Sequence, residues 1–136
     1  MKTSAIVQTV FRMLFPFVIV FGLYIIIHGA VSPGGGFQGG AVLATALLGV
    51  YIITDLHPSE IHVFVLLEKF IFLALVFITC ISFFTRGVPF TNFVHISASI
   101  GMKRIFLALL NILIGMKVAL GFSIIFSTFY EEGKND

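Results

Sequence analysis

The chain has 136 residues, of which 59% are hydrophobic and only 10% are charged, and its formal net charge is +2. An ordinary soluble domain carries roughly 25% charged residues, so this chain lacks the polar side chains that would cover a water-exposed surface. The composition predicts a single-domain integral membrane protein. The small net charge gives no sign of nucleic-acid binding. The lone cysteine, Cys80, excludes a disulfide framework and a thiolate metal cluster, and we interpret it as a small apolar filler.

Four apolar segments are long enough to cross a bilayer, whose hydrocarbon core is about 30 Å thick and takes ~20 helical residues. The expected spans cover residues 6–28, 36–54, 63–85 and 105–129. They predict an all-α, four-helix membrane domain over the whole chain, 1–136. Pro16 should kink the first span, because its ring clashes with the preceding turn. No small-residue cleavage site ends this span, so we expect it to be a membrane helix and not a signal peptide.

A glycine-rich stretch, SPGGGFQGG at residues 32–40, separates the first two spans. It matches the dinucleotide fingerprint G-x-G-x-x-G at Gly34, Gly36 and Gly39, and Asp55 follows at the expected distance. That fingerprint requires a β-strand before it and a soluble βαβ unit around it, and neither can be built between membrane spans. We therefore reject nucleotide binding. We interpret Asp55 as a charge near the membrane surface and keep it as a candidate for the ion or proton path.

The first glycines should instead serve a chain reversal. Pro33 starts a turn, and Gly34 and Gly35 can adopt the positive φ values that a reversal needs. We favour a tight, buried start of the second helix, with its positive end toward a polar space and with Gln38 bonding part of the freed backbone. An ordinary surface loop is the alternative.

The later glycines should pack against a helix. Gly36, Gly40 and Ala44 are four residues apart, and such a stripe of small residues lets another helix approach closely. The loop and packing motif comprises Ser32, Pro33, Gly34, Gly35, Gly36, Phe37, Gln38, Gly39, Gly40 and Ala44.

Lys117 is the sharpest candidate for a functional site. It lies at the midpoint of the fourth span, about 18 Å from either end, which is too far for its side chain to reach the surface. Ionisable residues inside a membrane are costly and indicate function by default. Lys117 belongs either to an ion or proton path or to a static ion pair between subunits.

The opposite face of the fourth span carries a second stripe of small residues: Ala108, Asn111, Gly115 and Ala119. Such a stripe is unsuited to lipid and suits close helix packing. Because the Lys117 face is also unsuited to lipid, we expect one face to pack within the chain and the other to pack against a partner.

Glu68 and Lys69 lie about six residues inside the third span, and both are candidates for the ion or proton path. Adjacent helical positions point about 100° apart, so both side chains cannot face one partner. Antiparallel third and fourth spans put Glu68 in the same half of the membrane as Lys117, ~9 Å apart in depth. Three alternatives follow. Glu68 pairs with Lys117 when both side chains are extended, it faces a neighbouring subunit, or the helix starts later and leaves Glu68 and Lys69 among headgroups.

His28 ends the first span, where it could relay a proton or donate to the glycine-loop carbonyls. His57, His62 and His95 fall in connections, and their spacing predicts no metal site. We expect the polar tail YEEGKND to be frayed. The sequence holds no nucleophile–base arrangement and no paired catalytic carboxylates, so we expect no enzymatic site.

The stretch HGAVSPGGGFQGGAVLA, which begins at His28, resembles the signature of the MnhB-like subunits of the Mrp-type multisubunit sodium/proton antiporters. The stretch NILIGMKVALGFSIIF, which begins at Asn111, resembles the last helix of the same family. The resemblance extends over nearly the whole chain. Similar subunits occur in the antiporter modules of archaeal membrane-bound hydrogenases and sulfur reductases. The short third connection and GMKVALG are more similar to that group.

The resemblance implies a small accessory subunit in a prokaryotic cytoplasmic membrane, with other membrane subunits and lipid as partners. It implies no cofactor bound by this chain, and sodium ions and protons as the transported species. Four spans put both termini on one side, and the distribution of Lys and Arg slightly favours the cytoplasm. The favoured function is a subunit of a Mrp-type antiporter. The alternatives are the same module in a hydrogenase or sulfur reductase complex, and a purely structural membrane subunit.

Overall fold

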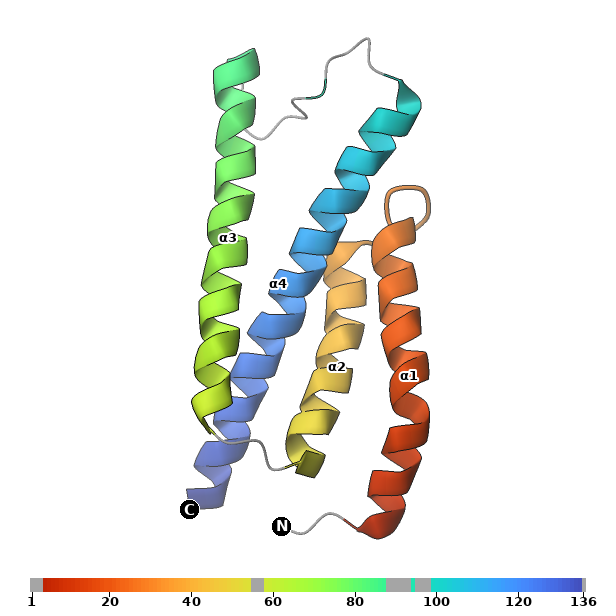
Figure 1. Ribbon diagram of the computed structural model, residues 1–136, viewed down its shortest axis with the longest axis vertical. Coiled ribbons are helices and arrows are strands. Elements are labelled where there is room, and N and C mark those ends of the chain that lie inside the picture. Colours follow the sequence, from red (N-terminus) through yellow and green to blue (C-terminus); the bar gives the residue numbers. More distant parts are fainter. Residues whose placement is uncertain (1–3, 55–57, 88–93, 95–98, 136) are drawn as a thin grey trace.

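A computed structural model of the chain describes residues 4–54, 58–87, 94 and 99–135. Within these residues the chain forms four helices: α1 (Ala5–His28), α2 (Gly36–Thr54), α3 (Pro58–Arg86) and α4 (Ile100–Asn135). Each contains a stretch long and apolar enough to cross a membrane. Successive helices alternate in direction, so α1 begins and α4 ends at the same end of the molecule (Figure 1). The predicted all-α architecture with four membrane helices is confirmed.

The helix ends differ most from expectation in α3 and α4. α3 begins at Pro58 and not at residue 63, because proline suits the first turn of a helix, where its missing N–H would be unpaired. α4 covers Ile100–Asn135 and not only 105–129, because its flanking charged residues are good helix formers although they are not apolar. The third connection is correspondingly shorter. α1 continues through Pro16 as one helix, and the kink there stays a prediction.

α4 is the central helix. It contacts α1, α2 and α3, whereas α3 contacts α4 alone among the described helices, and α1 and α2 lie side by side (Figure 1). Ile26 of α1 marks the point where α1, α2 and α4 meet, and it is only 2% exposed. A methyl group added at Gly39 or at Gly115 would lie 2.4 Å or 2.6 Å from this side chain. The missing side chains at these two glycines therefore make room for Ile26.

The turn between α1 and α2 has the predicted backbone geometry. Gly34 and Gly35 have φ values of +146° and +131°, which residues other than glycine rarely adopt. The backbone nitrogen and the hydroxyl of Ser32 donate to the carbonyl oxygen of His28 at 2.9 and 3.1 Å. The expected role of Gln38 is wrong, because its side chain is exposed and forms no hydrogen bond with the described residues. The turn is closed by Ser32 instead.

The α2 stripe packs against α4. A methyl group added at Gly36 would lie 2.5 Å from the carbonyl oxygen of Asn111, and one at Gly40 would lie 2.5 Å from that of Gly115. Ala44 continues this buried stripe at 2% exposure. Such close backbone approach is the packing that small residues permit in membranes. The small-residue face of α4 therefore packs within the chain, as one of the two expected faces should.

Candidate functional site

The candidate site is an ion pair between α3 and α4. Nζ of Lys117 donates to Oε1 of Glu68 at 2.6 Å, and the two side chains are 33% and 23% exposed. Lys117 lies near the middle of α4, 17 residues after Ile100. Of the three alternatives for Glu68, the extended pair with Lys117 is the observed one. A later start of the helix is wrong, because α3 begins at Pro58.

The paired side chains reach each other because α3 and α4 are unequal and not parallel. Glu68 lies ten residues after Pro58, about 15 Å along the helix. α4 extends past the start of α3 at this end, and the two helices converge there while they diverge at the other end (Figure 1). Counting residues from the helix ends therefore overestimates how far apart the two residues lie in depth.

An aromatic ring completes the surroundings of the ammonium group. Phe72 follows Glu68 by four residues, so both side chains lie on one face of α3. Nζ of Lys117 lies 5.1 Å from the centre of the Phe72 ring, within the range of a cation–π interaction. Lys69 is exposed, as its different direction on the helix requires. α3 thus presents a carboxylate and a ring to one lysine of α4.

One of the two faces of α4 was expected to pack against a partner subunit. The Lys117 face does not need a partner for this, because it packs within the chain. It packs on α3 through the ion pair, so both unusual faces of α4 are used within the chain. The pair nevertheless stays open on one side. Oε2 of Glu68 accepts no hydrogen bond from the described residues, and no buried side-chain oxygen among them lacks a partner. A donor outside the chain can therefore reach this oxygen.

Among the described residues, the predicted ion-path candidate His28 is not brought to this pair. His28 is exposed, its ring stacks on Tyr24 with centroids 4.1 Å apart, and its Nδ1 lies 3.2 Å from the Tyr24 carbonyl oxygen. The expected bond from its ring to the glycine-loop carbonyls is therefore wrong. His62 is exposed. Asp55 lies outside the described residues, as do His57 and His95.

Two polar features were missed from the sequence. The hydroxyl of Tyr51 on α2 donates to Oε1 of Glu131 on α4, and the Tyr130 ring lies edge-on to Tyr51 at 6.1 Å. The prediction that the polar tail from Tyr130 onward is frayed is wrong, because α4 continues to Asn135. The Asn111 amide lies beside the glycine turn, 3.0 Å from a methyl group added at Gly29. Its position four residues before Gly115, on the small-residue face of α4, was the available signal.

The fold and this pair define a multi-pass membrane protein with a charged contact between two of its helices. The family described as "Domain related to MnhB subunit of Na+/H+ antiporter" matches residues 6–124. The chain belongs to this family, which agrees with the resemblance seen in the glycine motif.

Two relatives support the same assignment. The chain is 29% identical over 56 residues to "Putative antiporter subunit mnhB2" of Staphylococcus haemolyticus strain JCSC1435, which covers 41% of this chain and 40% of the relative. It is also similar to a chain in the solved membrane-bound sulfane sulfur reductase, an archaeal respiratory membrane complex. That similarity has 31% identity and a TM-score of 0.64, and it covers 91% of this chain and 56% of the other. The chain thus spans about half the length of these relatives or less.

Proposed function

We propose that this chain is a small accessory subunit of a multisubunit sodium/proton antiporter of the Mrp type. Membership of the MnhB family supports a role in transport and not in catalysis. The chain itself would bind no cofactor, and the complex would exchange sodium ions for protons across a prokaryotic cytoplasmic membrane. Both termini would face the cytoplasm.

The observation that carries this proposal is the Lys117–Glu68 pair. An ionisable residue in a membrane span costs roughly 2.5–3.5 kcal/mol on insertion scales, so two of them in contact indicate a retained function. A lysine and a carboxylate joined by one hydrogen bond can pass a proton between Nζ and Oε1. Rotation of the protonated carboxyl group would then turn this proton toward the open side of the pair, where an acceptor outside the chain could take it. We therefore assign the pair to an ion or proton path that continues in a neighbouring subunit.

Other membrane subunits are the proposed partners. α3 contacts α4 alone among the described helices, and its remaining faces carry exposed apolar side chains such as Phe70 and Phe77. Lipid can cover such faces, but the accessible oxygen of Glu68 needs a polar neighbour. Another membrane protein of the complex, packed on α3, would supply one.

A second candidate function is the same module in a redox-driven respiratory complex. The similarity to a chain of the sulfane sulfur reductase complex favours it, since that similarity covers 91% of this chain. The two functions share the membrane chemistry and differ in the partner subunits. A purely structural subunit is a third alternative, and the charged pair argues against it.

The experiment is sodium-dependent proton flux in vesicles that hold the whole complex with altered Lys117. Lys117→Met keeps much of the side-chain length without the charge, and Lys117→Arg keeps a charge that is not released. We expect both complexes to assemble and both to lose exchange. The matched control is Arg104→Met, which removes an exposed cation elsewhere on α4 and should leave flux unchanged. Normal flux in Lys117→Met would refute the assignment, and substantial flux in Lys117→Arg would reduce the pair to a static contact.

A further inference from the structure

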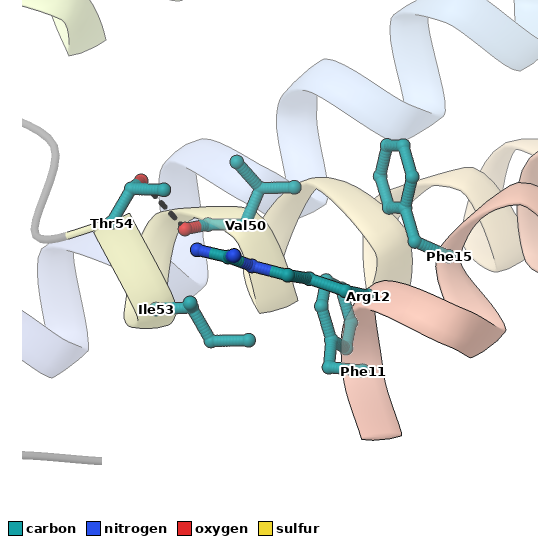
Figure 2. Close-up of a pocket in the computed structure, with 6 residues that line it drawn as sticks. All are labelled: Phe11, Arg12, Phe15, Val50, Ile53 and Thr54. Carbon is teal, nitrogen blue, oxygen red and sulfur yellow. Dashed lines mark hydrogen bonds between the residues drawn. The ribbon is translucent and has the colours of Figure 1, made fainter. Parts of the chain in front are cut away.

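A groove between α1 and α2 lies away from the ion pair. It is lined by three residues of each helix: Phe11, Arg12, Phe15, Val50, Ile53 and Thr54 (Figure 2). Its volume is about 230 Å³ and it opens to the outside of the bundle. Arg12 is the one charged residue of the lining, and the rest is mainly apolar. The groove lies near the beginning of α1 and the end of α2, at one end of the molecule.

Close packing of α1 on α2 shapes the groove. A methyl group added at Gly49 would lie 2.0 Å from Cε2 of Phe11, so the Phe11 ring rests on the α2 backbone where a side chain is missing. The Phe15 ring continues this apolar wall, with its centroid 5.9 Å from that of Phe11. The Thr54 hydroxyl donates to the Val50 carbonyl oxygen at 2.7 Å, which occupies its proton within α2 (Figure 2). The guanidinium is therefore the lining group that still has donors to offer.

The side chain of Arg12 is long enough to extend from its position in α1 to the level of the lipid headgroups. It lies seven residues after Ala5, about 10 Å inside α1, and its side chain is exposed. Figure 2 shows the side chain extending from α1 toward the last turn of α2, near Val50 and Thr54. No carboxylate of the described residues pairs with it. Long cationic side chains near helix ends extend in this way to the level of the headgroups.

We propose that this groove binds one anionic glycerophospholipid, with its phosphate on the Arg12 guanidinium and an acyl chain along Phe11, Phe15 and Ile53. The planar guanidinium matches a phosphate with two parallel hydrogen bonds. A lipid fills both halves of the site, because it carries a phosphate and an apolar chain in one molecule. A carboxylate from another subunit would satisfy only the charged half and leave the apolar lining open. Basic pockets between membrane helices are known to hold acidic headgroups.

The test measures lipid retained by the purified complex that contains the full chain, by native mass spectrometry after mixing with phosphatidylglycerol or phosphatidylcholine. The wild-type complex should retain one phosphatidylglycerol molecule. The Arg12→Gln complex should bind this lipid about tenfold more weakly, which is the loss of affinity expected when charge-assisted hydrogen bonds are removed. Ile53→Trp should show the same loss, because it fills the groove and leaves Arg12 in place. Arg104→Gln, an exposed arginine outside the groove, should bind as wild type does.

Several results would overturn the proposal. Equal retention in Arg12→Gln would exclude the site, and loss in Arg12→Gln without loss in Ile53→Trp would exclude the groove. Equal weakening for phosphatidylcholine would exclude selection of an anionic lipid. Loss of another protein from the Arg12→Gln complex with unchanged lipid would assign Arg12 to a protein partner. Asp55→Asn tests the carboxylate that follows Thr54 in the sequence, and a tenfold gain in bound lipid in that variant would show that Asp55 competes with the lipid for Arg12 in the native chain.

Discussion

Neither charge of the Lys117–Glu68 pair can be removed alone without leaving the other in an apolar setting. Helical counting from the sequence places both residues in one half of the membrane but leaves their contact open, since it measures depth from the edges of apolar runs. The edges of α3 and α4 lie beyond those runs, at Pro58 and Asn135. The pairing depends on helix inclination, which no local pattern encodes. Lys117 is therefore identifiable from sequence, whereas its pairing with Glu68 stays one of three alternatives until the helices are placed.

The contact predicts a strong coupling between the two positions. Lys117→Met and Glu68→Gln should each destabilise the purified complex, because each single change leaves the other polar group without its partner. The two losses of stability added together should exceed the loss in the double variant. We expect a coupling free energy of roughly 0.5–3 kcal/mol from a double-mutant cycle on thermal stability. Glu68→Gln combined with Arg104→Met is the matched non-contacting pair. Additive effects in the Lys117 cycle would show that the hydrogen bond contributes nothing.

At the scale of the helices, the period of small residues predicted the packing well. The glycine stripe of α2 lies on the small-residue face of α4, at Gly40 and Gly115. Apolar length identified each helix, because crossing a bilayer demands it. The ends of the helices were harder to predict, because the polar residues of α4 near Glu131 can stay helical outside the apolar layer. The Tyr51–Glu131 hydrogen bond was missed for that reason.

The close approach of α2 and α4 makes a prediction about bulk. Gly40→Leu adds a large side chain where even a methyl group would lie 2.5 Å from the Gly115 carbonyl oxygen, so α2 and α4 must separate. We expect loss of the intact complex on a native gel. Gly121→Leu is the control, because a methyl group added there meets nothing within 4 Å. Equal assembly of both variants would show that α2 and α4 do not touch at Gly40.

At the scale of the whole molecule, the described residues bury few side chains. Seven hydrophobic residues form the core, and many large apolar side chains of α1 and α3 remain exposed. The sequence could not predict that α3 docks on α4 alone among the described helices, because the many exposed apolar side chains of α3 can meet either lipid or protein. The arrangement leaves the ion pair at an open flank of the bundle. Such a subunit depends on neighbours to enclose its charges.

That openness predicts that the isolated chain does not transport ions. Vesicles reconstituted with this chain alone should show no sodium-dependent proton flux, because one lysine and one carboxylate do not make a continuous path across the membrane. Vesicles with the whole complex, prepared in the same lipid, provide the positive control. Clear exchange by the chain alone would contradict an accessory role.

The most direct test of the central claim is copurification. The claim is that this chain is one subunit of a multisubunit cation/proton-translocating membrane complex. The tagged chain would be extracted from its native membrane in mild detergent, and the associated proteins would be identified by mass spectrometry. We predict a stoichiometric set of larger membrane subunits, without redox subunits for a Mrp-type antiporter and with iron–sulfur subunits for the respiratory alternative. Recovery of the chain by itself, as a stable and fully extracted protein, would contradict the account.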